Sequence, residues 1–426
     1  MYKKQAFSNG LRLVTVPMKG TKAVTILVLV GTGSKYEDKK NNGISHFLEH
    51  MFFNGTNKRP NTLAIAETLD RIGGEYNAFT SKEYTGYYAK VDVKHLHLAL
   101  DWVSDIFLNS KLDSQEIERE KGVIIEEINM YLDTPIKYIG DLWEELLYNN
   151  QPAGWKILGE KETIAKMKRK QFLDYLKEHY LAKNVVIVVA GNIGKAKSPA
   201  YGRKVQSYFA DIKKGRPKAK QKVVEKQKKP EVLVHYKKTD QTHLYLGVRG
   251  YDIFDSRKYA LGLLSVILGG NMSSRLESSV KGKEGLAYYI RTSVQAYTDS
   301  GYLVTYAGVD NKKVEKAIKI ILDEYKKITQ EKVGVMELKK AKDYIKGSTV
   351  LDLESSDAIA SFLGGQEILT GKILTPEEKF AKIDSVTVKD IYEVANDVFK
   401  PEKLNLALIG PFKNEGEFKQ ILDSSF

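Results

Sequence analysis

The sequence predicts an α+β protein built of two tandem homologous domains, each a mostly antiparallel sheet covered by helices. Three observations predict this class: the length of 426 residues, the mixture of strand and helix patterns, and an approximate internal repeat. A chain of this length exceeds what one hydrophobic core usually organises. Its 42% hydrophobic and 10% aromatic content is typical of a globular protein and argues against wholesale disorder.

The internal repeat is clearest near the end of each half. A helical pattern leads into the apolar strand 185–190 in the first half, and a similar pattern leads into strand 404–409 in the second. Gly191 and Gly410 close these strands. Glu116 and Glu337 occupy similar helical segments, and their offset in sequence is nearly the same as that of the two glycines. Two offsets that agree this closely favour a duplication.

Strand patterns begin each half, and helices then alternate with further strands. Alternating or continuous apolar runs bounded by glycine or charged turns predict strands at 11–17, 24–31, 84–93, 232–236 and 243–248. A long helix is expected at 116–131.

A lysine-rich stretch separates the two halves. Residues 213–229 contain nine Lys or Arg and one Glu, a balance of 9 − 1 = +8 within a net charge of +13. Pro217 lies in the run and Pro230 follows it, a composition that is typical of a solvated linker. A functional basic arm is the alternative, but no basic helix or aromatic platform accompanies it, and we expect no nucleic-acid partner. We therefore expect domains at 1–212 and 231–426, joined by a linker at 213–230.

Composition also limits the chemistry and the location. The chain contains no cysteine, which excludes disulfides, thiolate ligands and a cysteine nucleophile. Its first ten residues lack the apolar run of a secretory signal. No segment approaches the ~20 apolar residues of a membrane span. We expect a cytoplasmic protein with no membrane partner, and any metal site must use His, Asp or Glu.

The most informative segment is His46-Phe47-Leu48-Glu49-His50. On a helix that advances ~100° per residue, the two histidines and the glutamate share one face, while Phe47 and Leu48 face a core. A hydrolytic zinc ion needs three protein ligands and one position open to water. His46 and His50 can supply two ligands. Glu49 would then be the base that takes a proton from the zinc-activated water.

The third ligand should be a carboxylate from another element. Glu120 and Glu127 are separated by two helical turns in the expected helix 116–131, so they share one face. We expect Glu127 to bind the metal and Glu120 to orient or tune the site. Other interpretations stay open at this point. Histidines four apart are more often a surface or core pair, and the pair Glu126-Glu127 in an acidic helix is, taken alone, most simply a solvated face.

The zinc motif continues as Met-Phe-Phe-Asn-Gly-Thr at 51–56, and the whole resembles the motif of the pitrilysin family of metallopeptidases. The family's downstream glutamate ligand fits Glu127 by its separation in sequence from His50. Glu126 also fits loosely, but Glu127 matches the family's register better. The family's accessory glutamate falls on Glu120. The resemblance covers nearly the whole chain. It implies one zinc ion per chain and an endopeptidase that cleaves peptides or unfolded polypeptides.

The same resemblance implies where substrate binds. Asn77-Ala78-Phe79 resembles the family's edge strand, which pairs with an extended substrate beside the zinc, although an ordinary buried strand is an alternative. In the second half, Lys281 and Tyr288 match positions that contact substrate near the zinc. The family usually has Arg where this chain has Lys281, which keeps the charge but loses the planar fork. Tyr288 would donate a hydrogen bond to the substrate carbonyl; a packed aromatic on an inner strand is the alternative.

No second His-x-x-Glu-His occurs after residue 230, so the second half is expected to enclose substrate and contact a partner. Related two-half chains typically pair into a clamshell, which implies a homodimer, or alternatively a heterodimer. Tyr288 and Lys281 would then act on the partner's zinc site. Two alternative functions are a non-catalytic family subunit that holds polypeptide, and a basic nucleic-acid-binding protein whose metal motif is incidental.

Overall fold

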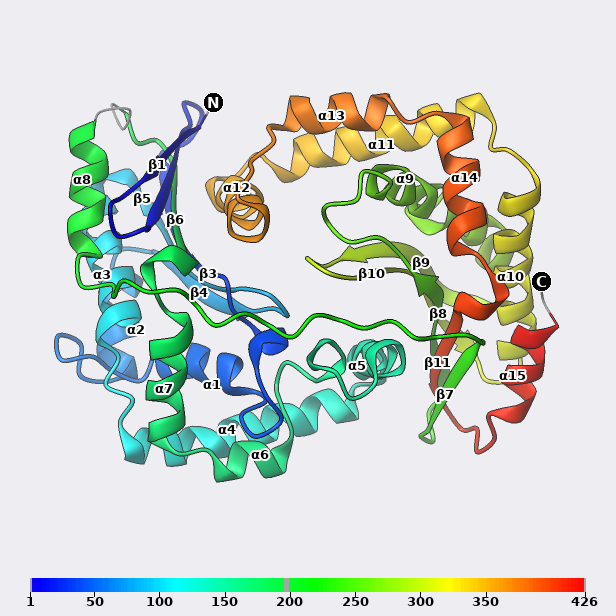
Figure 1. Cartoon of the computed structure of the whole chain (residues 1–426), viewed down its shortest axis with the longest axis horizontal. Coiled ribbons are helices and arrows are strands. Elements are labelled where there is room, and N and C mark those ends of the chain that lie inside the picture. Colours follow the sequence, from blue (N-terminus) through cyan, green and yellow to red (C-terminus); the bar gives the residue numbers. More distant parts are fainter. Residues whose placement is uncertain (1, 195–198, 425–426) are drawn as a thin grey trace. The chain divides into compact units, whose positions relative to one another are not determined.

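The computed structural model describes residues 2–194 and 199–424, and these form two compact units (Figure 1). Unit 1 comprises Met1–Asn129, Trp155–Gln221 and Val350–Thr375; unit 2 comprises Met130–Gly154, Lys222–Thr349 and Pro376–Phe426. Each unit combines one sheet with several helices. This confirms the predicted α+β class with two tandem domains.

The sheet of unit 1 has six strands in the order β1-β2-β6-β3-β5-β4. Their bounds are β1 Lys3–Ala6, β2 Arg12–Pro17, β3 Ala23–Val30, β4 Glu75–Thr80, β5 Thr85–Asp92 and β6 Val185–Gly191. Only the β2–β6 pair is parallel among these described strands. The central strands β3 and β6 are apolar and buried almost throughout, whereas β4 lies at one edge.

The sheet of unit 2 repeats this arrangement in the order β7-β11-β8-β10-β9. Its strands are β7 Glu231–Tyr236, β8 Gln241–Arg249, β9 Ala287–Ala296, β10 Gly301–Asp310 and β11 Leu404–Gly410. The order matches β2-β6-β3-β5-β4 position by position, and β7–β11 is again the parallel pair. The topology therefore supports the duplication, and both sheets are mostly antiparallel as expected.

Helices cover the sheets. Those that begin in unit 1 are α1 Ile44–Met51, α2 Thr62–Asp70, α3 Leu96–Asn109, α4 Ser114–Asp133, α6 Lys161–Lys166, α7 Arg169–His179, α8 Pro199–Tyr208 and α12 Ser356–Thr370. Those that begin in unit 2 are α5 Pro135–Tyr148, α9 Lys258–Gly269, α10 Val314–Gln330, α11 Val335–Asp352, α13 Pro376–Asp384, α14 Val388–Val398 and α15 Gly416–Asp423. Across the described ranges, no helix combines the length and apolar character needed to cross a membrane.

Two helices at equivalent positions are exchanged between the halves of the sequence. Helix α5 comes from the first half but packs on β7, β8 and β11 of unit 2. Helix α12 comes from the second half but packs on β2, β3 and β6 of unit 1. The compact units are therefore not contiguous in sequence, and they differ in these two segments from a simple division at 213–230.

A buried carboxylate anchors each exchanged helix. On α12, Glu367 is fully buried, with its carboxylate 2.7 Å from Lys4 Nζ and 3.2 Å from Arg12 Nη1. On α5, buried Glu144 accepts hydrogen bonds from the hydroxyls of Tyr297 and Tyr302. Burying a carboxylate without such partners would be costly, so these contacts specify which sheet each helix covers.

The lysine-rich segment 213–230 contains neither helix nor strand, and most of its side chains are exposed. Its backbone is nevertheless held at several points. The amide of Lys218 donates to the carbonyl of Glu178, and Val224 exchanges two hydrogen bonds with the Gln151 side chain. Lys220 Nζ lies 3.4 Å from the buried carboxylate of Glu83. The segment is thus an extended connection with fixed contact points.

Candidate metal centre

Helix α1 contains the predicted zinc motif, and its apolar side anchors it to the core. Phe47 and Leu48 are fully buried, and the Phe47 ring packs on Phe172 with centroids 4.8 Å apart. The opposite side of the helix presents His46, Glu49 and His50, because their spacing places them within about one quadrant.

The start of α1 is fixed by Glu37, a residue that the sequence analysis missed. Its buried carboxylate accepts hydrogen bonds from the Gly43 amide at 2.7 Å, the Ser45 amide at 2.9 Å and the Asn42 side chain at 2.9 Å. Burial raises the pKa of Glu37, and these donors oppose the rise. Donors at a helix N-terminus favour a carboxylate there. A single acidic residue in a loop gives no sequence signal for this role.

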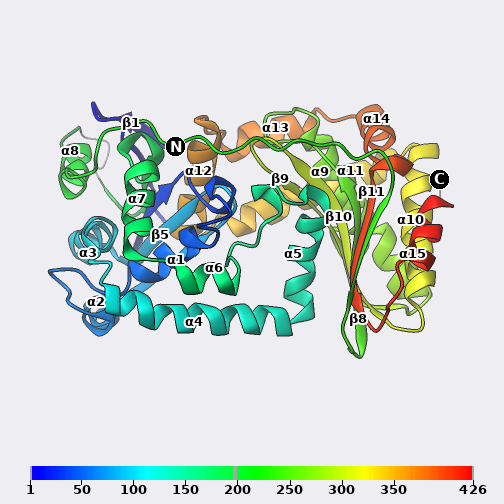
Figure 2. The ribbon, with the colours of Figure 1, turned by 60° about the horizontal axis from the view of Figure 1, so that its bottom comes forward.

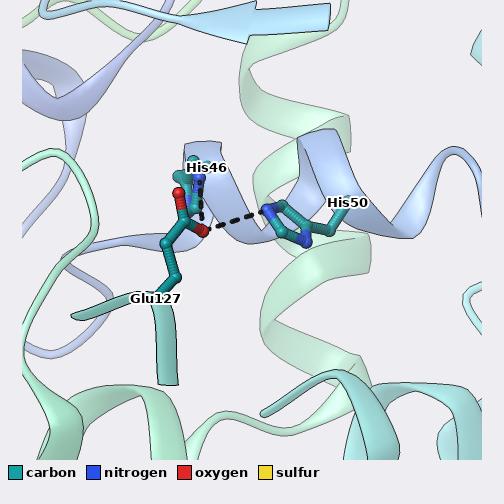
Figure 3. Close-up of side chains that lie close together, drawn as sticks. All are labelled: His46, His50 and Glu127. Carbon is teal, nitrogen blue, oxygen red and sulfur yellow. Dashed lines mark ion pairs between the residues drawn. The ribbon is translucent and has the colours of Figure 1, made fainter. Parts of the chain in front are cut away.

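Helix α4 (Figure 2) brings Glu127 to the two histidines, as Figure 3 shows. Glu127 Oε2 lies 3.5 Å from His46 Nε2 and 3.5 Å from His50 Nε2. One donor atom from each of the three residues lies within 4.8 Å of the others, and the described residues contain no other such group. Ligands bound at ~2.1 Å in a tetrahedron are about 3.4 Å apart. The spacing and the N/N/O donor set therefore fit a zinc ion.

Glu120 fixes the orientation of His50. Its Oε1 lies 2.8 Å from His50 Nδ1, which leaves Nε2 directed at Glu127. A histidine that donates through Nδ1 has the Nε2 lone pair free for a metal. Although burial would raise the pKa of Glu120, the His50 and Asn54 hydrogen bonds hold it below its usual value.

The two histidines have opposite pKa shifts. Burial, together with the neighbouring His50, lowers the pKa of His46 to about 4. Burial also disfavours charged His50, but hydrogen bonds with Glu120 and Glu127 raise its pKa to about 9. His46 is thus ready to act as a neutral ligand, whereas metal binding would displace a proton from His50.

Glu49 lies beside this group and outside it. Its Oε2 accepts a hydrogen bond from Thr80 Oγ1 at 2.6 Å, and burial raises its pKa. A half-buried carboxylate with a raised pKa and one oriented oxygen has the properties of a general base. The role of Thr80 was not predicted, because its contact with Glu49 joins residues 31 apart in sequence.

The structure distinguishes the two adjacent glutamates of α4. Glu126 is exposed and accepts a hydrogen bond from Asn129, whereas Glu127 faces the histidines. Consecutive residues on a helix point about 100° apart, so only one of the pair can face the centre.

Residues 77–79 lie in strand β4, at the edge of the unit 1 sheet. Asn77 is exposed, and its Oδ1 accepts the Ala78 amide at 2.8 Å. Phe79 is half-buried. The segment is therefore an edge strand as expected, while binding of substrate by Asn77, Ala78 and Phe79 stays a prediction.

Lys281 and Tyr288 belong to unit 2, whereas the histidine and glutamate group belongs to unit 1. Lys281 lies in the π-helical segment Glu277–Lys283, and its Nζ is 3.0 Å from Glu277 Oε1. Tyr288 lies on the edge strand β9 and is 61% exposed, so the alternative of a packed aromatic on an inner strand is wrong. The roles of both residues stay predictions.

Comparisons with known proteins decide the family. Residues 12–161 match the family described as Insulinase (Peptidase family M16), and residues 166–345 match the Peptidase M16 inactive domain. The uncharacterized zinc protease YmxG of Bacillus subtilis (strain 168) is 39% identical over 97% of this chain and 99% of its own length. The chain belongs to peptidase family M16.

This M16 chain is also 33% identical to the uncharacterized zinc protease SCO5738 of Streptomyces coelicolor, over 97% of this chain and 90% of that protein. A protease structure from Helicobacter pylori shares its fold with a TM-score of 0.89 and 24% identity, covering 96% and 99% of the two chains. A peptidase M16 inactive domain structure from Pseudomonas fluorescens has a TM-score of 0.87 and 20% identity, covering 97% and 98%. The predicted resemblance to the pitrilysin family is confirmed.

The part of the second half that the structure describes contains no copy of the metal group. When the offset between Glu116 and Glu337 is applied, Ala341 and Ser348 stand where the first half has Glu120 and Glu127. Among the described residues, His46, His50 and Glu127 form the one candidate metal group. Unit 2 therefore repeats the fold without the ligands.

Proposed function

We propose that this M16 chain is a zinc-dependent endopeptidase that hydrolyses peptides or unfolded polypeptides. The observation that supports this most directly is the group of His46, His50 and Glu127, with Glu49 adjacent to it and held by Thr80. Three protein ligands plus a separate carboxylate are the components of a hydrolytic zinc site. The names of the relatives, zinc proteases, support the choice of metal.

Each side chain then has a distinct task. Bound zinc supplies Lewis-acid chemistry, which acidifies water and polarises a carbonyl. Glu49 accepts the proton of the attacking water on a carboxylate that Thr80 orients, and it returns the proton to the leaving amine. Glu120 keeps His50 Nε2 directed at the centre. The negative charge of Glu127 balances part of the charge of the ion.

Strand β4 suits an extended substrate. It pairs with β5 on one side, and the Ala78 amide is bonded to its neighbour Asn77 rather than to a strand. A peptide that added to this edge would take main-chain hydrogen bonds, which require an extended backbone but little sequence. This chemistry favours peptides and unfolded segments over folded proteins.

The partner that we propose is a second copy of the chain. The exposed Tyr288 of one subunit would donate a hydrogen bond to the substrate carbonyl at the partner's zinc site. Lys281 of the same subunit would contact the substrate there. A heterodimer with a related chain is the alternative. The cytoplasmic location expected from the sequence stays a prediction.

The proposal is tested with purified protein and a mixed peptide library. We expect about one zinc per chain and new internal termini detected by mass spectrometry, lost with a chelator and restored by added zinc. Glu49→Gln is the matched control, which should keep the metal and lose cleavage by about 10²–10⁴-fold. Zinc binding without cleavage of any peptide would favour the alternative of a non-catalytic subunit that holds polypeptide.

A further inference from the structure

We infer that Asn54 is a positioning residue of the metal centre: its amide holds Glu120, and through Glu120 the ligand His50. Asn54 lies in the turn that follows α1, four residues after His50. The inference rests on the zinc site proposed above and assigns it a further residue.

The Glu120 carboxylate receives one donor on each oxygen. His50 Nδ1 lies 2.8 Å from Oε1, and Asn54 Nδ2 lies 3.1 Å from Oε2. A carboxylate held by a single hydrogen bond can rotate about its terminal bond, whereas two donors from different directions fix its plane. The direction of the His50 ring depends on that plane.

The orientation of the Asn54 amide follows from its other partners. Its Oδ1 accepts hydrogen bonds from Arg119 Nη2 at 3.2 Å and from Thr62 Oγ1 at 3.0 Å. A guanidinium has no acceptor, and an ionised carboxylate has no donor. The oxygen must therefore face Arg119, and the NH₂ group must face Glu120.

The backbone around Asn54 is rigid. Gly55 has φ +119°, and a Cβ there would lie 2.5 Å from the carbonyl oxygen of Pro60, so the tight turn requires glycine. The Thr56 amide donates a hydrogen bond of 2.7 Å to the Arg59 carbonyl oxygen, which closes the turn. Asn54 is thus presented to Glu120 from a fixed turn.

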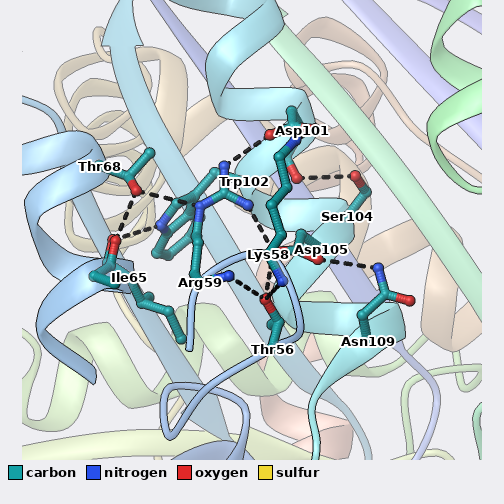
Figure 4. Close-up of polar contacts among 11 residues, drawn as sticks. Thr56, Lys58, Arg59, Ile65, Thr68, Asp101, Trp102, Ser104, Asp105 and Asn109 are labelled. Carbon is teal, nitrogen blue, oxygen red and sulfur yellow. Dashed lines mark hydrogen bonds and ion pairs between the residues drawn. The ribbon is translucent and has the colours of Figure 1, made fainter. Parts of the chain in front are cut away.

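A buried ionic cluster holds this turn against α3 (Figure 4). Arg59 donates to Asp105 at 2.6 Å and to Asp101 at 2.7 Å, and the Thr56 hydroxyl reaches the same Asp105 oxygen at 2.7 Å. Thr56, Arg59 and Asp105 are almost completely buried. A buried ion pair adds little net stability but specifies one geometry, which suits an element that positions a metal site.

The substitution Asn54→Asp tests this role because it is nearly isosteric. It replaces an NH₂ donor by a carboxylate oxygen directed at Glu120, so packing is kept while the hydrogen bond becomes a repulsion. Asn54→Ala removes the donor without adding charge. Asn109→Ala is the matched control, since exposed Asn109 donates at 3.0 Å to the Asp105 oxygen that Arg59 and Thr56 do not use, and it has no described contact with Glu120.

Zinc affinity is measured by competition with a chromophoric chelator, and ligand geometry by the visible spectrum of the cobalt-substituted protein. We expect Asn54→Asp to weaken zinc binding by about 10–100-fold and to alter the cobalt spectrum. Asn54→Ala should have a smaller effect, and Asn109→Ala should match wild type. The free energy of unfolding of each metal-free variant shows whether weaker zinc binding comes from loss of the fold. If Asn54→Asp does not fold, the zinc affinity and cobalt spectrum of Asn54→Ala provide the test.

Failure of the proposed Asn54 role can be distinguished from failure of the proposed function. Tight zinc binding by wild type, with unchanged affinity and spectrum in both Asn54 variants, overturns the role of Asn54 and leaves the proposed function intact. Absence of zinc binding by wild type itself overturns both.

Discussion

The hydroxyl of Thr80 lies 2.6 Å from a carboxylate oxygen of Glu49, and this contact joins the edge strand β4 to helix α1. Thr80 is the last residue of β4, and Ala78 lies two positions earlier. The strand proposed to pair with substrate therefore also orients the proposed base. A displacement of the strand would displace both the peptide and the proton acceptor.

Thr80→Val should lower kcat by about 10–100-fold, because a small misplacement of a catalytic group is costly. Zinc content should stay at the wild-type value, since the Thr80 hydroxyl donates its hydrogen bond to Glu49, which is not one of the proposed ligands. Thr80→Ser keeps the hydroxyl and should retain most of the activity. Steady-state kinetics and metal analysis of the two variants provide the measurement. Full activity in the Val variant would contradict a role in orienting Glu49.

Glu127→Gln should weaken zinc retention more than the ~10–100-fold typical of losing an outer hydrogen-bond partner, because a ligand charge is removed. The adjacent Glu126→Gln is the matched control. Glu126 is exposed, so its substitution should change the free energy of zinc binding by about 0.5 kcal/mol or less. Isothermal titration with zinc compares the two, and the reverse ranking would assign the ligand to the other face of α4.

Trypsin should cleave first within 213–230, where exposed lysines lie in a segment without helix or strand. Arg216 and Lys229 precede proline and should resist. The backbones of Lys213 and Lys218 are hydrogen-bonded to unit 1, and Lys220 is held by Glu83. The expected sites are therefore Lys214, Lys222, Lys226 and Lys228. A denaturing gel should show two fragments of similar size.

Under native conditions the two fragments should elute together on gel filtration. Each fragment contains a helix that belongs to the compact unit of the other, α5 in one and α12 in the other. Separate elution of folded fragments would show that the exchanged helices are dispensable.

Mixing two inactive variants tests whether the working site is shared between subunits. In a heterodimer of Glu49→Gln with Tyr288→Phe, a trans arrangement creates one site with both substitutions and one with neither. After random exchange, about a quarter of the wild-type sites should be restored in a two-fold symmetric dimer. Exchange is verified by native mass spectrometry of differently labelled chains. Exchange without any recovery of activity would place Tyr288 in the same subunit's site, or outside it.

Much of the sheet architecture could be predicted from the sequence. Apolar strands such as β3 and β6 have strong local signals, and the internal repeat indicates two similar sheets. The exchange of α5 and α12 could not be predicted. The apolar face of α5, with Trp143 and Leu147, shows that the helix is buried, but periodicity does not say against which sheet.

The candidate site also contains residues that could be predicted from the sequence and residues that could not. The helical spacing of His46 and His50 is a local property, and the heptad spacing of Glu120 and Glu127 puts both on one face. The partners that orient these groups are not local. Asn54 and Thr80 are common polar residues in a turn and at a strand end, and their importance depends on contacts with residues 66 and 31 positions away.

The exchanged helices also bear on how such a chain could have arisen. If one half is the older unit, it would have contained a helix whose apolar face did not pack on its own sheet. Two copies of that half could each bury this helix on the sheet of the other copy, which is a domain-swapped dimer. Fusion of the two gene copies would then have converted a helix exchange between two chains into an exchange within one chain. Only after that step could one copy lose its metal ligands while the other kept them, because the two halves no longer shared one sequence.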